Sequence, residues 1–526
     1  MKNRTLLFAL VVLLAAFLMI APGCAPEEPE VVDEVDDVDV DDVVEEKVLR
    51  VSITINPNTI EPATSDVRQG ANVAWQIFDS LVWLSDDLEI VPALAEDWDV
   101  SEDGTVYTFY LREGVTFHNG YPFTAEDVVF TWERGREPGI TYREDFLPVV
   151  EMNIIDDYTV EMILEEPNAM LMMLMNEHWG ILSKQYHEEF GEEGYMQEPV
   201  GTGPFKFVEW RHGDQIVLEA FEDYWKPGYP KVDQVVFKVI PDPSTRFAAL
   251  IRDEIDIINL VPPELTADIE AEDGVELIRY PLDRVFYIAF NNMTTGVGTP
   301  IENKLVRQAL SYAIDYDAII NTIFEGHADR VHGFVVPGNL GYDPSFEPYP
   351  YDPERAKELL AEAGYADGFS IGMAGPAETY INFEEVLLAV TNYFEAIGVM
   401  VDLEFMESGM YWSLQADREL PPMYGDSWSS SMGEAFPRIS GALGGWDASY
   451  CAWYDPVIID MIRELQLAVD PEERAEVYRR LQEYMLEDPP FIYLYQPVNF
   501  EAINSRVQNY NPRSSEAYYL EGVGIE

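Results

Sequence analysis

Histidine and cysteine, the residues that most often carry enzyme chemistry, are few and scattered in this sequence. Among 526 residues there are six histidines and two cysteines. His187-Glu188 could begin an H-E-x-x-H zinc helix, but Gly191 stands where the second histidine would bind the metal. No G-x-S-x-G turn is present to expose a serine nucleophile. We therefore expect no catalytic site, no metal and no cofactor.

Carboxylates are abundant enough to form the acid–base pair of a glycosidase. The chain has 97 aspartates and glutamates against 32 lysines and arginines, a formal net charge of −65. No single carboxylate pair stands out by its spacing, so a secreted hydrolase remains an outside alternative to a protein without catalytic activity.

The charge itself restricts the partners of the protein. A surface this acidic repels nucleic acid and anionic lipid headgroups, so we expect neither as a partner. An acidic surface is typical of a halophilic protein, which stays soluble in high salt. Capture of cationic ligands by this surface is the alternative interpretation.

Two tryptophans lie in stretches rich in glycine and serine. Trp428 belongs to the run D-S-W-S-S-S, and Trp446 belongs to G-A-L-G-G-W-D. Their indole rings are amphipathic and could stack on a sugar or cover a peptide side chain. Packing of both rings in the core is the alternative, and the sequence leaves the two possibilities open.

The N-terminus has the features of an export signal. Lys2 and Arg4 precede an apolar run, residues 6–20, that is too short to cross a bilayer comfortably. The stretch that ends in Cys24 resembles a bacterial lipoprotein cleavage site, so residues 1–24 are predicted to be a lipoprotein signal peptide with Cys24 lipidated. A plain secretory signal is the alternative. Cys451 would then have no disulfide partner and is expected to be a buried thiol.

The segment 25–47 is dominated by acidic residues that repel one another, and it is predicted to be a disordered tether. The following stretch of about 480 residues is too long for a single core, so at least two lobes are expected. Predicted strands and helices alternate along it, which indicates an α/β fold.

Local patterns predict several elements. Residues 73–82 have helical spacing, and Asp315, Asp352 and Asp470 are expected to cap the starts of helices. The segment 105–133 predicts a strand at 106–111, a short second strand at 115–117 and a helix that begins at Thr124. These elements form a compact β-turn-β-turn-α unit.

Three stretches carry a family resemblance: 105–133, 199–207 (P-V-G-T-G-P-F-K-F) and 306–315 (V-R-Q-A-L-S-Y-A-I-D). They resemble signatures of family 5 of the extracytoplasmic solute-binding proteins of ABC importers, the class with dipeptide- and oligopeptide-binding proteins. The resemblance extends over nearly all of residues 49–498. It implies a two-lobed periplasmic-binding-protein-like (type II) fold with an extra small α/β subdomain, mixed sheets and a hinge between the lobes.

The resemblance also implies a division of the chain. Lobe I is expected to combine 48–70 with 196–285 and 491–526. The small subdomain is expected at 71–195, and lobe II at 286–490.

The implied function is that of a receptor. It would capture a solute between the lobes, a peptide in the first place, and deliver it to the permease and ATPase of an importer. The protein would be extracytoplasmic, lipid-anchored to the membrane and monomeric. A receptor for an oligosaccharide or another small polar solute is the alternative within the family.

The resemblance implies that two loops bind the ligand, one after the first strand and one around Trp428. Peptide-binding members have an aspartate three residues after this tryptophan, which pairs with the α-amino group of the peptide. Ser431 occupies that place here, so Asp426 or Glu434 would have to supply the charge. The expected ligand-binding residues are Thr59, Ile60, Glu61, Asp426, Trp428, Ser429, Ser431 and Trp446.

Overall fold

The computed structural model describes residues 46–65, 67–85, 89–430, 432–448 and 450–526. Residues 46–526 form one unit. Cys24, the predicted signal peptide and residues 25–45 of the predicted tether lie outside the described residues. Within the described ranges, no helix combines the length and the apolarity that a membrane span requires.

A mixed sheet of twelve strands organises the unit. Most of its strand pairings are antiparallel, whereas β1 is parallel to β10 and β11, and β15 is parallel to β16 and β17. Its strands are β1 (Val48–Ile53), β8 (Phe205–Arg211), β9 (Gln215–Ala220), β10 (Gln234–Val239), β11 (Ile257–Ile258), β12 (Val275–Pro281), β13 (Arg284–Phe290), β14 (Ala328–Asp329), β15 (Phe369–Pro376), β16 (Val399–Met406), β17 (Met423–Ser429) and β18 (Phe491–Asn504).

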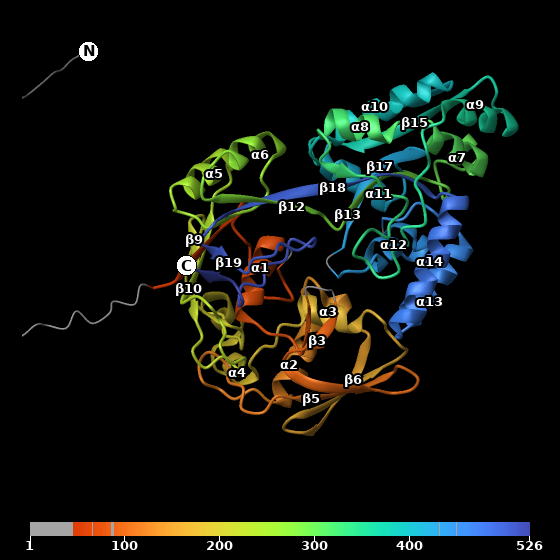
Figure 1. Ribbon diagram of the computed structural model, residues 1–526. Coiled ribbons are helices and arrows are strands. Elements are labelled where there is room, and N and C mark those ends of the chain that lie inside the picture. Colours follow the sequence, from red (N-terminus) through yellow and green to blue (C-terminus); the bar gives the residue numbers. More distant parts are fainter. Residues whose placement is uncertain (1–45, 66, 86–88, 431, 449) are drawn as a thin grey trace, which may run out of the picture. The chain divides into compact units, whose positions relative to one another are not determined.

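Strand β18 connects the two halves of this sheet. Its first residues pair with β13, and its last residues pair with β12 and β11. Strands β12 and β13 follow one another along the chain, with only Leu282 and Asp283 between them. Figure 1 shows β12 and β18 running side by side from the strands around β10 toward β13 and β17. Two segments of the chain therefore cross between the halves.

One large core surrounds β13, β15 and β17 and draws its buried residues from between Val285 and Tyr495. Amphipathic helices cover these strands, because their apolar faces need a sheet to pack against. The helices of this region are α7 (Lys304–Tyr312), α8 (Tyr316–Ile323), α9 (Pro353–Glu362), α10 (Phe383–Ala396), α11 (Ser408–Ala416), α12 (Phe436–Leu443), α13 (Pro456–Leu467) and α14 (Pro471–Glu487), with the short turns η2 (Pro300–Glu302) and η3 (Gly445–Asp447).

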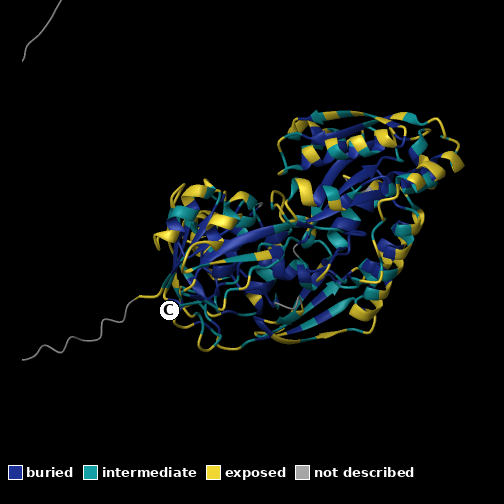
Figure 2. Ribbon diagram, turned by 45° about the horizontal axis from the view of Figure 1, so that its top comes forward, coloured by how far each residue is buried: buried dark blue, intermediate teal, exposed yellow. Residues whose placement is uncertain are grey.

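A second core joins β1 and β10 to a four-stranded antiparallel sheet in the order β4-β5-β7-β6. A smaller core lies under α5 and α6. In Figure 2 the strands are mainly buried and the exposed residues gather on helices and loops. The remaining elements are β2 (Val82–Leu84), β3 (Ile90–Pro92), β4 (Ala95–Val100), β5 (Val106–Leu111), β6 (Val149–Asp156), β7 (Thr159–Leu164), β19 (Val507–Gln508), β20 (Gly524–Ile525), α1 (Arg68–Ile77), α2 (Ala125–Gly135), α3 (Leu171–His178), α4 (Lys184–Gln197), α5 (Pro243–Ile251), α6 (Pro263–Glu270) and η1 (Arg143–Asp145).

The predicted unit at 105–133 is present, with one difference. Strand β5 and helix α2 form as expected, and the Asp127 carboxylate accepts a hydrogen bond of 2.9 Å from the backbone N–H of Thr124. The predicted strand at 115–117 is reduced to a single bridge between Thr116 and Pro122, because the turn returns the chain directly to the start of α2.

The helix predicted at 73–82 lies earlier in the chain, at Arg68–Ile77. Helix α1 ends at Ile77, and Val82 already belongs to β2. The cause is Asp79, which is buried and accepts hydrogen bonds from the side chains of Thr202, Tyr224 and Trp225. Satisfying this buried carboxylate outweighs the local helical spacing.

The three predicted helix caps are confirmed. The carboxylates of Asp315, Asp352 and Asp470 accept hydrogen bonds from backbone N–H groups in the first turns of α8, α9 and α14. In α9 and α14 a proline follows at the first helical position, where no donor is lost.

Candidate ligand-binding site

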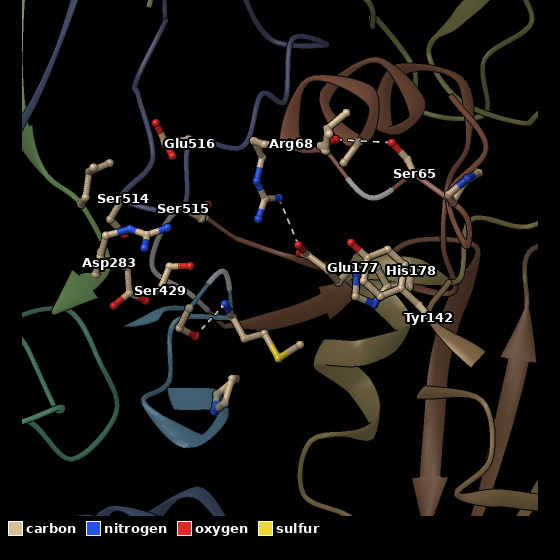
Figure 3. Close-up of a pocket in the computed structure, with 18 residues that line it drawn as sticks. Ser65, Arg68, Tyr142, Glu177, His178, Asp283, Ser429, Ser514, Ser515 and Glu516 are labelled. Carbon is tan, nitrogen blue, oxygen red and sulfur yellow. Dashed lines mark hydrogen bonds and ion pairs between the residues drawn. The ribbon is translucent and has the colours of Figure 1, made fainter. Parts of the chain in front are cut away.

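A cavity of about 380 Å³ lies where the chain crosses between the halves of the large sheet (Figure 3). One part of its lining comes from α1 and the end of α3, including Arg68 and Glu177. Another part comes from the β12–β13 connection and the end of β17, including Asp283 and Ser429. The C-terminal segment adds residues 514–516. The volume is that of a site for a small ligand.

Most charged groups of this first cavity are already paired. The Arg68 guanidinium is directed toward Glu177 and lies 3.0 Å from its carboxylate (Figure 3). Asp283 is buried and lies 2.6 Å from the guanidinium of Arg438. The His178 ring lies 2.6 Å from Asp145.

Glu516 is different, because it forms no ion pair within the described part of the chain. Its Oε1 atom accepts one hydrogen bond of 3.3 Å from the Nδ2 group of Asn499. Burial raises the pKa of the Glu516 carboxyl, and Arg68 and Arg284 oppose that shift from a distance. No sequence motif marked this residue.

A second cavity of about 360 Å³ adjoins the first, since Arg284 and Ser429 line both. Aromatic rings form much of its wall, and Asp426 lies among them together with Gln415 and Ser427. The aromatic residues are Tyr380, Trp412, Trp428 and Tyr450.

Asp426 is only 3% exposed, and its carboxylate has no cationic partner within ion-pair distance among the described residues. Its Oδ2 atom accepts hydrogen bonds from Gln415 Nε2 at 2.8 Å and from the Tyr287 hydroxyl at 3.2 Å. Burial raises the pKa of Asp426 to about 6, against these hydrogen bonds, which lower it. A cationic ligand group would supply the missing charge.

Arg284 lies at the junction of the cavities and has no carboxylate partner in the described ranges. Its Nη1 group donates a hydrogen bond of 2.7 Å to the Ser427 hydroxyl, and its guanidinium lies 5.8 Å from the Tyr380 ring centroid. A guanidinium held in this way is suited to bind a carboxylate of a ligand.

The structure brings three of the predicted ligand-binding residues to these cavities: Asp426, Trp428 and Ser429. Ser431 lies outside the described residues. Trp446 does not line either cavity. The residue is 59% exposed, and the Arg418 guanidinium lies 5.1 Å from its ring centroid.

The loop after the first strand reaches the first cavity at Pro62, the residue that follows the three predicted ligand-binding residues of this loop. Thr59, Ile60 and Glu61 are not in the lining of either cavity. Ile60 is buried in the second core, and the Glu61 carboxylate lies 3.1 Å from Arg134. Contact of these three residues with a ligand stays a prediction.

Two histidines, His118 and His332, and the free thiol of Cys451 make contacts outside the two cavities. His118 contacts backbone atoms of Gly201 and Gly203, and His332 lies 3.0 Å from the Gln482 side chain. Cys451 is buried, as predicted, and burial raises the pKa of its thiol to about 11. No group of three or more potential metal ligands is present among the described residues.

Comparison with protein families identifies one match. Residues 89–450 match the model of the bacterial extracellular solute-binding proteins, family 5. The dipeptide-binding protein of Escherichia coli K12 is 31% identical over 469 residues, which cover 83% of this chain and 86% of the relative. The glutathione-binding protein GsiB of Salmonella typhimurium LT2 is 30% identical, with 84% and 87% covered.

Solved structures agree with the family match. HbpA2 from Haemophilus parasuis has a TM-score of 0.84 and 26% identity, covering 91% of this chain and all of its own. DppA from Helicobacter pylori, in complex with the peptide STSA, has a TM-score of 0.73 and 27% identity, covering 91% and 98%. These likenesses confirm the predicted α/β fold with two lobes.

Proposed function

This chain belongs to family 5 of the bacterial extracellular solute-binding proteins, and on that premise we propose that it is the peptide receptor of an ABC importer. It captures a short peptide in the two adjoining cavities and delivers it to the membrane permease. Cys24 carries a lipid that anchors the receptor to the membrane, and residues 25–47 tether the folded part to this anchor. The receptor acts as a monomer.

The observation that carries this proposal is the pair of opposite charges without ion-pair partners in the described chain. Asp426 provides a carboxylate and Arg284 a guanidinium, both in the lining of the second cavity. A peptide has an ammonium group and a carboxylate at its ends, so it matches both groups. Burying either charge of the peptide without a partner would cost several kcal/mol.

Relatives support a peptide as well, since those named above bind dipeptide or glutathione by name and one structure holds the peptide STSA. Aromatic rings in the second cavity favour a second candidate, an oligosaccharide, because Trp412 and Trp428 could stack on sugar rings. A sugar would leave Arg284 and Asp426 without ionic partners, and we therefore place the peptide first.

Capture would involve closure of the two lobes about the crossing segments. Strand β18 and the connection between β12 and β13 pass between the halves of the large sheet, and Leu282 and Asp283 on that connection line the first cavity. A ligand that contacts both sides stabilises the closed state by its differential affinity.

Solution scattering together with mass spectrometry tests the receptor function. The purified protein should show a smaller radius of gyration with a bound dipeptide, and the dipeptide should be recovered intact after release. Hydrolysis of the dipeptide by the pure protein would favour the secreted hydrolase instead. Closure with an oligosaccharide but not with any dipeptide would favour the sugar receptor.

A further inference from the structure

We propose that Glu516 selects peptides with a basic side chain, so that the preferred ligand is a short peptide ending in lysine or arginine. This inference rests on the proposed peptide function and adds a side-chain preference to it. It starts from the position of Glu516 in the first cavity, which Arg284 also lines.

The backbone and the carboxylate of Glu516 are both held by hydrogen bonds within the protein. Its backbone N–H donates to the Arg513 carbonyl at 2.9 Å, and its own carbonyl accepts a hydrogen bond of 3.0 Å from Asn72 Nδ2. Asn499 Nδ2 donates to Oε1. These contacts hold residue 516 at φ 61°, a left-handed conformation that is unfavourable for a residue with a side chain.

Glu516 remains available because Arg68, a cation that attracts it, is already paired with Glu177. Arg68 attracts Glu516 from a distance, but its guanidinium bonds directly to Glu177 at 3.0 Å. Figure 3 shows the Arg68 guanidinium directed to Glu177. A cationic group of the ligand can therefore approach Glu516 without breaking an existing ion pair.

The cavities together contain one carboxylate more than they contain guanidinium groups, once the pair of Asp283 with Arg438 is set aside. His178 does not change this balance, because it is paired with Asp145. A peptide with neutral side chains has no net charge and would leave one carboxylate uncompensated. The remaining charged residues are Arg68, Arg284, Glu177, Glu516 and Asp426.

The order of the charged residues along the two cavities indicates where the second cation of the ligand would bind. Asp426 lies in the second cavity, Arg284 lies at the junction and Glu516 lies in the first cavity. The complementary ligand has a cation, an anion and a second cation in that order. A peptide with a C-terminal lysine or arginine can present this pattern, since its ammonium group lies at one end, and its α-carboxylate and its basic side chain branch from the last Cα atom at the other. The net charge of −65 would also raise the local concentration of such a ligand.

Calorimetry on two dipeptides tests the inference. Ala-Lys and Ala-norleucine have side chains of similar length, but only lysine carries an ammonium group. We expect the wild type to bind Ala-Lys at least ten times more tightly than Ala-norleucine at pH 7.5. The Glu516→Gln variant should lose this preference through a weaker affinity for Ala-Lys. Glu270→Gln, on the exposed surface of α6, removes the same charge at a residue that lines neither cavity, and should leave the preference unchanged.

Each outcome of this calorimetry either supports or overturns the role of Glu516. Equal affinity of the wild type for the two dipeptides would overturn the role of Glu516 and leave the peptide function intact. Binding of neither dipeptide would contradict the peptide function and the inference with it. The wild-type comparison is sufficient even if Glu516→Gln fails to fold. A preference that survives in a folded Glu516→Gln protein would assign the selectivity to another group and overturn the inference.

Discussion

The Nη2 atom of Arg474 lies 2.7 Å from Oε1 of Glu434, and both side chains are buried. The Tyr478 hydroxyl donates a hydrogen bond of 2.8 Å to the other oxygen of the same carboxylate. Glu434 is thus neutralised inside the protein and is absent from the lining of both cavities. Of the two carboxylates that could replace an aspartate at Ser431, only Asp426 faces a cavity.

Replacement of Glu434 should therefore affect stability and not binding. Glu434→Gln leaves the Arg474 guanidinium buried without its carboxylate, which should cost about 3–5 kcal/mol of unfolding free energy. Urea denaturation measures the loss. Peptide affinity, measured under conditions where the variant is folded, should stay within about twofold of the wild type. A large loss of affinity with little loss of stability would contradict this prediction and indicate that Glu434 binds the ligand.

A buried carboxylate on β18 makes stability depend on pH. Glu501 accepts hydrogen bonds from the hydroxyls of Tyr280 and Tyr510, and burial raises its pKa from 4.5 to about 7. The folded protein therefore holds a proton on Glu501 that the unfolded chain releases at lower pH. As pH rises from about 4.5 to about 7, this group should lower the unfolding free energy by about 3 kcal/mol.

Comparison of the wild type with Glu501→Gln isolates this effect. Unfolding free energies at pH 5 and pH 8 should differ less in the variant than in the wild type, because glutamine does not titrate. The same pH dependence in both proteins would show that Glu501 is not responsible.

The excess of carboxylates predicts a dependence on salt. Repulsion within a chain of net charge −65 is screened over shorter distances as the ionic strength rises. The melting temperature should therefore increase from dilute buffer to molar sodium chloride. An unchanged melting temperature would contradict the halophilic interpretation of this surface.

Lipidation can be tested directly in cells. Metabolic labelling with a fatty acid should mark the wild type and leave Cys24→Ser unlabelled, because Cys24 is the only cysteine in the N-terminal segment. Equal labelling of the two proteins would end the lipoprotein hypothesis.

Local sequence patterns predict the helices and strands that depend only on interactions between neighbouring residues. The aspartate–proline starts of α9 and α14 and the alternating strand β5 require only neighbouring residues. The end of α1 was misplaced because it depends on contacts of Asp79 with distant residues, such as Thr202 and Trp225. Propensity cannot predict such contacts.

Contacts between distant residues also limit how much of the candidate site can be predicted from the sequence. Trp428 and Asp426 were found through a family resemblance, whereas Arg284 and Glu516 belong to no motif. Glu516 reaches the cavity because Asn72 holds its carbonyl across a separation of 444 residues. A single sequence carries no signal for an interaction of that range.

The central claim is that Asp426 recognises the free ammonium group of a peptide, and calorimetry on one dipeptide with and without an N-acetyl group tests it most directly. At pH 7.5, above the pKa of about 6, Asp426 is ionised. Acetylation removes the charge of the ligand and should weaken binding to the wild type at least tenfold. Asp426→Asn should weaken binding of the free peptide and reduce the effect of acetylation. Equal affinity of the wild type for the two forms would show that the ammonium group is not recognised, and would contradict the peptide assignment at this site.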